Sequence, residues 1–69
     1  MYPMEKRMPV ISIEMGPTAL EKKQELIQAL TTAAAKILTL PEQSFVVLIK
    51  EYPLDAIGVG GQSLSHRIL

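Results

Sequence analysis

Residues 8–15 read Met-Pro-Val-Ile-Ser-Ile-Glu-Met, and this stretch decides the fold. Ile11, Ile13 and Met15 share one face of an extended chain, because side chains alternate between the two faces of a strand. The stretch is rich in β-branched residues, which favours a strand. Proline is tolerated at the first residue of a strand, where the missing N–H donor matters least. We therefore predict a strand over residues 9–15 that begins at Pro9.

The position of Pro9 directly after Met8 has a chemical consequence. An aminopeptidase can split a Met–Pro pair when that methionine is the initiator, and the secondary amine of the proline then becomes free. A free prolyl amine is a base and a nucleophile, whereas an internal prolyl nitrogen is a non-basic amide. Apolar surroundings lower the pKa of such an amine toward neutrality, where a general base works best. The apolar residues that we expect around it are Val46, Val47, Ile57 and Val59.

Residues 1–8 are expected to be an N-terminal extension or leader, and residues 9–69 to form the domain. The first seven residues show no hydrophobic period and mix charge with one proline. Methionines at Met1, Met4 and Met8 leave the start of translation open. One interpretation is a vector-derived leader or a misplaced start. The other is a native arm that packs on a neighbouring subunit, with Tyr2 and Met4 as anchors.

A helix is predicted from Thr18 to about Leu38. Gly16-Pro17 ends the preceding strand, and Thr18 with Glu21 matches a capping box for the first helical turn. Pro41 ends the helix, because a residue before proline avoids helical geometry, and residues 41–44 form a connection or one helical turn. The apolar stripe recurs at three- and four-residue steps and comprises Leu20, Ile27, Leu30, Ala34 and Ile37, widened by Leu26, Ala33 and Leu38.

A second strand is predicted over residues 45–49, Phe-Val-Val-Leu-Ile, continued by Lys50 and Glu51. It does not alternate, and a continuous apolar run of strand length indicates that both faces of the sheet are covered. One helix covers only one face. Something outside this chain must therefore cover the other face, which favours an oligomer.

The predicted fold class is α+β, with a β-α-β protomer at its centre. Two strands joined by a helical crossover should be parallel and right-handed. The turn-rich tail over residues 52–63, with apolar pieces at Ile57 and Val59, predicts a short C-terminal hairpin. Residues 63–69 are expected to form a last helical turn.

Size and composition also favour an oligomer. A chain of 69 residues is one domain, and such a chain buries only about 60% of the surface that it exposes when unfolded. Small folds need a disulfide, a metal or a partner, yet the chain has no cysteine and only one histidine, His66. The hydrophobic fraction of 48% is generous for this size.

Charge and hydropathy exclude other classes. The formal net charge is zero, so the clustered basic face of a nucleic-acid-binding protein is not expected. No apolar run reaches the ~18 residues of a membrane span, and the first residues lack the apolar core of a signal peptide. We therefore expect a cytoplasmic protein.

Other candidate motifs favour simpler interpretations. The stretch Gly58-Val59-Gly60-Gly61 lacks the spacing of a phosphate-binding loop and reads as a hairpin. His66 has serines nearby but no third residue to orient its ring. Depending on register, Glu14 and Glu51 lie on the same side or on opposite sides of the sheet. The cations open to an anionic substrate are Lys6, Arg7, Lys50 and Arg67, each expected to be solvated.

The whole pattern resembles the 4-oxalocrotonate tautomerase family, and its short DmpI-like branch in particular. The resemblance rests on Met-Pro-Val-Ile-x-Ile at residues 8–13, the amphipathic helix, Val-Leu-Ile-Lys-Glu-Tyr-Pro at residues 47–53 and Ile-Gly-Val-Gly-Gly at residues 57–61. It implies protomers that dimerise into a four-stranded sheet within a larger oligomer, usually a hexamer. It also implies an isomerase without a cofactor, whose N-terminal proline moves a proton in a dienol or 2-oxo acid.

The family's site residues match this chain unevenly. Pro9 matches the catalytic proline, and Ser44 a serine near the substrate carboxylate. Met15 falls at the end of the first strand, and Val59 at an apolar pocket position of the hairpin. Val46 and Thr18 stand where well-studied members carry arginines, and Ile57 where they carry an aromatic residue. Loss of both arginines removes charge-assisted contacts to a 2-oxo acid, so we expect an altered substrate preference.

Two functions follow as hypotheses. The first is a tautomerase that uses Pro9 as its base on a simple enol acid such as phenylenolpyruvate. The alternative is a catalytically impaired family member that serves as an oligomeric binding or scaffold protein, with the nitrogen of Pro9 kept as an amide by residues 1–8.

Overall fold

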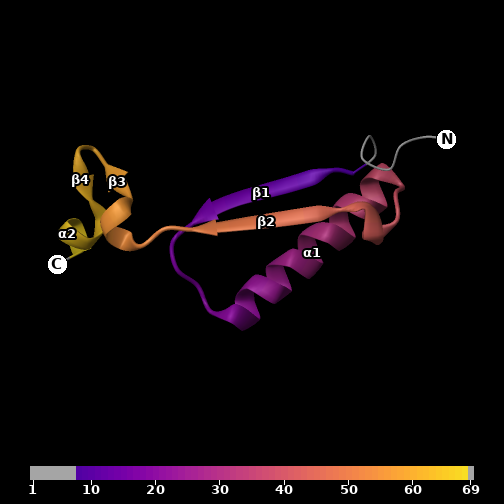
Figure 1. The fold of residues 1–69 in the computed structure, drawn as a ribbon, viewed down its shortest axis with the longest axis horizontal. Helices are drawn as coiled ribbons and strands as arrows, with labels where there is room; N and C mark the ends of the chain where they lie inside the picture. Colours follow the sequence, from indigo (N-terminus) through magenta and orange to yellow (C-terminus); the bar gives the residue numbers. More distant parts are fainter. Residues whose placement is uncertain (1–7, 69) are drawn as a thin grey trace.

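The elements follow the predicted order. The computed structural model describes residues 8–68, so the predictions on Tyr2, Met4, Lys6 and Arg7, and on the side chain of Arg67, lie outside the described parts. In chain order the elements are β1 (Val10–Met15), α1 (Leu20–Leu38), the 3-10 turn η2 (Glu42–Ser44), β2 (Val46–Glu51), the 3-10 turn η3 (Leu54–Ala56), β3 (Gly58–Val59), β4 (Gln62–Ser63) and α2 (Leu64–Ile68) (Figure 1).

Strands β1 and β2 lie side by side and run parallel, as the crossover rule predicts. Their register pairs Val10 with Val46 at one end and Met15 with Glu51 at the other. Helix α1 runs beside the two strands, with its start near their carboxyl ends (Figure 1). The α+β class and the β-α-β protomer are therefore confirmed.

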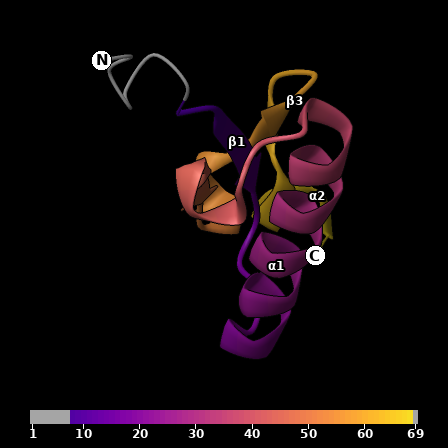
Figure 2. The ribbon, with the colours of Figure 1, turned by 90° about the vertical axis from the view of Figure 1, so that its right-hand side faces the viewer.

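The register sorts side chains onto two faces of this sheet. Residues Ile11, Ile13 and Met15 of β1 are half-buried, whereas Val10, Ser12 and Glu14 between them are exposed. Figure 2 looks from the end of the molecule where the N-terminus lies and shows α1 standing to one side of β1. The helix thus covers one face and leaves the other open.

The open face carries apolar surface on both strands. Val10 is 55% exposed, and Leu48 of β2 is 53% exposed. Val46 shares this face because it is the register partner of Val10. Within the protomer, α1 therefore covers the apolar run of the second strand on one face, and the other face stays exposed.

The N-terminus of α1 differs from its prediction. The helix begins at Leu20, its N-cap is Ala19, and no side chain caps it, so the predicted capping box of Thr18 and Glu21 is wrong. The N–H of Thr18 bonds the carboxylate of Glu51 instead. Glu51, which is distant in the sequence, thus accepts the hydrogen bond that the capping box would have assigned to Glu21.

The C-terminus of α1 lies at Leu38, as predicted. The stop is made by Thr39, which adopts the left-handed conformation with φ 53° and donates its N–H to the carbonyl of Ala35. Leu40 donates to the same carbonyl at 3.1 Å. The helix therefore closes before Pro41 is reached, and residues 42–44 form the single turn η2.

The apolar stripe of α1 is only partly covered. Ile27, Leu30 and Ala34 are half-buried as predicted. Leu20 is 76% exposed and Ile37 is 79% exposed. Ala33 and Leu38 are exposed too, so these four predicted stripe positions are wrong for a single protomer.

The described protomer has almost no core of its own. Among residues 8–66, whose side chains are described, Ala35 is the one buried apolar residue, and no large side chain is fully buried. The accessible surface is 5352 Å², whereas a compact monomer of 7.6 kDa should expose about 4300 Å². The Cα radius of gyration is 16.0 Å, against about 11 Å for a compact chain of this length.

The C-terminal elements form a small unit beyond the carboxyl ends of β1 and β2 (Figure 1). Strands β3 and β4 pair antiparallel, which confirms the predicted hairpin. Gly60 and Gly61 form its turn with positive φ, a conformation that glycine adopts without a steric penalty. Within residues 8–68, no helix is both long and apolar enough to span a membrane.

Candidate active site

Pro9 lies at the start of β1 and is fixed by the neighbouring strand. Its carbonyl oxygen accepts a hydrogen bond from the N–H of Val46 at 3.0 Å. The ring is half-buried, while Met8 before it is 41% exposed. In the chain as printed, the nitrogen of Pro9 is bonded to Met8 and is an amide.

Ser44 lies at the same end of the sheet, in the turn that leads into β2. It is 2% exposed, and its N–H donates to the carbonyl of Pro41 at 3.0 Å. The turn is tied to α1 through Glu42, whose carboxylate accepts bonds from Thr32 at 3.1 Å and Gln28 at 3.4 Å. The structure thus brings Pro9, Ser44 and Val46 to one end of the sheet.

Met15 and Ile57 lie at the opposite end, where they line a pocket of about 520 Å³. The pocket sits between the carboxyl ends of β1 and β2 and the C-terminal unit. A β-strand advances about 3.3 Å per residue, so the six residues of β1 separate Pro9 from this pocket by roughly 20 Å. Within one protomer, the apolar surroundings expected for Pro9 therefore lack Ile57 and Val59.

Val59 lies apart from both groups. It is 48% exposed on β3 and does not line the pocket. The six candidate residues thus divide into three at the proline end, two at the pocket and one on the hairpin. As site residues they remain predictions.

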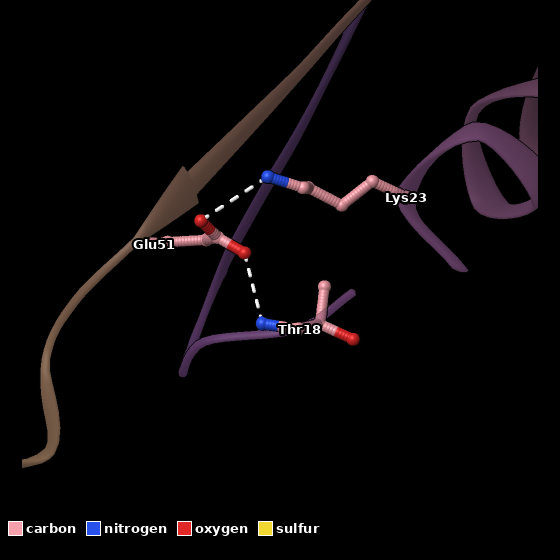
Figure 3. A network of polar contacts seen from close by, with 3 residues as sticks. All are labelled: Thr18, Lys23 and Glu51. Carbon is pink, nitrogen blue, oxygen red and sulfur yellow. Dashed lines mark hydrogen bonds and ion pairs between the residues drawn. The ribbon is translucent and has the colours of Figure 1, made fainter. Parts of the chain in front are cut away.

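Glu51 ties the pocket end together in a way that the sequence analysis missed (Figure 3). Its Oε2 accepts the N–H of Thr18 at 2.9 Å, and its Oε1 accepts a bond from Lys23 Nζ at 3.3 Å. The bond from Thr18 and then that from Lys23 hold the pKa of Glu51 below its ordinary value of 4.5. The loop after Met15, which forms one wall of the pocket, is thereby held to β2.

The contact of Glu51 with the start of α1 could have been predicted from the topology of a parallel β-α-β unit. The carboxyl ends of both strands and the start of the crossover helix meet at one edge of the sheet. An acidic residue that ends the second strand is therefore close to free N–H groups at the helix start. Glu51 is that residue.

Glu14 and Tyr52 form a second polar contact at this end. The register places Glu14 opposite Lys50 on the open face, whereas Glu51 pairs with Met15 on the helix side. The two glutamates therefore point to opposite faces. Tyr52 donates its N–H to the carbonyl of Met15 at 2.9 Å, and its hydroxyl lies 3.4 Å from Glu14 Oε1.

The remaining chemical candidates have structural explanations. Ser63 accepts the N–H of His66 at 3.3 Å, and its hydroxyl lies 3.2 Å from that of Ser65, so Ser63 bonds the start of α2. The exposed histidine has no catalytic arrangement with them. In residues 8–68, no group of three or more His, Cys, Asp or Glu side chains is placed to hold a metal ion.

Comparison with known proteins gives a consistent result. Residues 9–67 match the family model described as "Tautomerase enzyme". A protein of Helicobacter pylori (strain J99 / ATCC 700824), described as "Probable tautomerase", is 38% identical over 64 residues, which cover 86% of this chain and 93% of that protein.

Solved structures agree with this result. TomN, a 4-oxalocrotonate tautomerase homologue in the tomaymycin biosynthetic pathway, matches with a TM-score of 0.81 at 30% identity, covering 87% of this chain and 94% of that one. DmpI from Helicobacter pylori matches with a TM-score of 0.74 at 34% identity, covering 84% and 98% respectively.

Proposed function

This chain belongs to the tautomerase enzyme family, and from that premise we propose that it is a cofactor-independent tautomerase with the amine of Pro9 as its general base. The observation that carries the proposal is where the family match begins. It starts at residue 9, so Pro9 is the first residue of the segment that matches the family model. Removal of residues 1–8 would turn the amide nitrogen of Pro9 into a secondary amine.

The proposed reaction is the ketonisation of an enol acid. The neutral nitrogen of Pro9 takes the proton of the 2-hydroxyl group, and a proton is returned to the third carbon as the carbonyl forms. The enzyme ends the cycle with the proton count with which it began. Apolar surroundings disfavour the ammonium form, which keeps the amine available as a base near neutral pH.

The hydrogen bond between Val46 and Pro9 supports this role. It fixes the carbonyl side of Pro9 in the sheet, so the nitrogen is presented at the very end of β1. A base on a rigid strand holds its position better than one on a loop. The turn that contains the buried Ser44 is tied to α1 through Glu42 and supports the same end of the sheet.

We further propose that the active site is completed by a second copy of the chain. A strand that pairs with its own copy across a two-fold axis runs antiparallel to it. If the free edge of β1 pairs in this way, Pro9 meets the pocket end of the partner, near the partner subunit's Met15. Such a dimer brings Pro9 of one protomer close to the pocket of its partner, although the two are roughly 20 Å apart within one protomer.

Several properties of the protomer support this assembly. Helix α1 packs mainly over β2, which leaves the β1 side of the sheet uncovered (Figure 1). On the open face of the sheet, Val10 is 55% exposed and Leu48 is 53% exposed. We propose a homo-oligomer built from dimers, with the hexamer as the form that the family resemblance implies.

The test is a substitution in the chain that begins at Pro9. Pro9→Ala should lower kcat/KM for phenylenolpyruvate by about 10²- to 10⁴-fold, the usual contribution of general acid–base catalysis. Pro17→Ala is the matched control, because Pro17 is an exposed loop proline of the same protein. Equal activity of the Pro9→Ala variant and the parent, with the same mass by light scattering, would contradict the proposal. The family match gives no support to the scaffold alternative, which depends on residues 1–8 being retained.

A further inference from the structure

The pocket at the carboxyl ends of β1 and β2 has an unequal lining. Its volume of about 520 Å³ falls within the usual range for small-molecule sites. Most of its wall is apolar and comes from Met15, Ala56, Ile57 and Leu64. The polar side chains in the lining are Glu14 and Tyr52. The pocket therefore has one polar side and otherwise suits an uncharged group.

The polar side is held in place by the backbone. Glu14 belongs to β1, and Tyr52 directly follows β2 with its N–H bonded to the carbonyl of Met15 at 2.9 Å. The hydroxyl of Tyr52 lies 3.4 Å from Glu14 Oε1, so this donor is directed at the carboxylate. Two neighbouring strand ends thus present one acidic group with a neutral donor beside it.

No cation balances this carboxylate inside the pocket. The lining contains no lysine, arginine or histidine. Lys50 is the register partner of Glu14, but it does not line the pocket, and no ion pair joins the two among the described residues. A second negative charge brought into the pocket would therefore meet the like charge of Glu14, and like charges repel.

We propose that Glu14 determines substrate specificity by excluding a second carboxylate from the pocket, while the hydroxyl of Tyr52 helps to hold the Glu14 carboxylate in place. The substrate class is then a monocarboxylic enol acid whose uncharged, apolar tail lies against Met15, Ile57 and their neighbours. The carboxylate and the enol of this substrate stay on the side of Pro9. The inference rests on the proposed function and on the dimer that brings the pocket to Pro9.

The first test compares two substrates with the chain that begins at Pro9. Phenylenolpyruvate carries one carboxylate and an aryl tail, whereas 2-hydroxymuconate carries a second carboxylate. Glu14→Gln removes the charge and keeps the shape, so the ratio of kcat/KM between the monoacid and the diacid should fall about tenfold. The preference of the parent should also shrink as salt is raised. An active enzyme whose ratio is unchanged by Glu14→Gln overturns the inference and leaves the proposed function standing.

Two further variants separate the local charge from other effects. Tyr52→Phe removes the hydroxyl and keeps the carboxylate, so the preference for the monoacid should persist. Asp55→Asn removes an exposed charge from η3 at the same end of the molecule without altering the pocket lining. If Asp55→Asn changes the ratio of kcat/KM between the two substrates as much as Glu14→Gln does, the selectivity comes from the overall negative charge at this end of the molecule. That result would overturn the inference.

A binding measurement distinguishes failure of the inference from failure of the proposed function. Hydrocinnamate and adipate are unreactive acids with one and two carboxylates, and calorimetry with the full 69-residue chain measures their affinities. Adipate should bind about tenfold more weakly, and Glu14→Gln should close the gap. If turnover is absent with every substrate, this pattern still supports the pocket's selectivity, whereas equal affinities in the parent overturn it.

Discussion

The N–H of Val46 donates a hydrogen bond of 3.0 Å to the carbonyl oxygen of Pro9, so Pro9 is held at the start of β1 by the neighbouring strand. The bond fixes one side of the proline and leaves its nitrogen at the end of the sheet. A base in this position needs surroundings that the protomer supplies only in part, because Met15 and Ile57 line a pocket at the far end of β1. The proposed activity therefore depends on assembly as much as on the proline.

Assembly is predicted to depend on the open face of the sheet. Leu48 is 53% exposed in the protomer, and a fully buried leucine contributes about 1.5–3 kcal/mol. Leu48→Glu should therefore shift the protein toward smaller species in light scattering, because it places a charge on the apolar face that we expect another copy of the chain to cover. Gln24→Glu adds the same charge on the exposed side of α1 and should leave the mass unchanged. An unchanged mass for Leu48→Glu would show that this face is not an interface.

The small core is predicted to be sensitive at Ala35. This residue is 8% exposed, and its carbonyl accepts the N–H of both Thr39 and Leu40. Ala35→Leu should lower the free energy of unfolding by about 1–3 kcal/mol through overpacking, as urea denaturation measures it. Ala33→Leu adds the same atoms on an exposed part of α1 and should change stability little. Equal effects of the two variants would contradict the packing described for α1.

The Glu51 contact predicts an acid-dependent part of the stability. The pKa of Glu51 is lowered in the folded protein from its ordinary value of 4.5, chiefly by the N–H of Thr18. The carboxylate therefore stabilises the fold above that value, and the contribution is lost as pH falls below it toward the folded pKa. Thermal unfolding should show that Glu51→Gln lowers Tm at pH 7 and removes part of the loss of stability below pH 4.5.

The matched control for this contact is Glu25→Gln, which removes an exposed glutamate that pairs with Lys22 at 3.7 Å. Exposed pairs of this kind contribute little. A Glu51→Gln variant with the same Tm and the same acid profile as the Glu25→Gln variant would show that the contact in Figure 3 has no role in stability.

Much of the fold could be predicted from local patterns. Alternation at Ile11, Ile13 and Met15 identified the first strand and its buried face. The helical period and the continuous apolar run at residues 46–49 identified the crossover and the parallel partner. These properties depend on side chains a few positions apart, which is the range over which sequence patterns carry information.

The failures came from contacts between distant residues. The capping box at Thr18 was wrong because Glu51, 33 positions away, takes the N–H that a local side chain would have taken. Leu20 and Ile37 fit the apolar period, but they are largely exposed in the protomer. The same limit hid the contact of Tyr52 with Glu14, since only the register brings these two residues together.

The separation of the candidate site residues within one protomer could not be predicted from the sequence either. Pro9 and Val59 each matched a family position, and sequence order gives no distance between them. In the structure, Pro9 lies at the start of β1, whereas Val59 lies on β3, beyond the other end of β1 (Figure 1). A site of this kind is complete only when copies of the chain meet, which one sequence does not display.

The most direct test of the central claim compares two proteins that differ by one residue, one beginning at Pro9 and the other beginning at Met8. Intact mass spectrometry confirms each N-terminus, light scattering confirms the same assembly, and the ketonisation of phenylenolpyruvate is followed by absorbance. The protein that begins at Pro9 should be active, and retention of Met8 should lower kcat/KM by about 10²-fold or more, because an amide nitrogen is not a base. Equal activity of the two proteins would contradict this prediction.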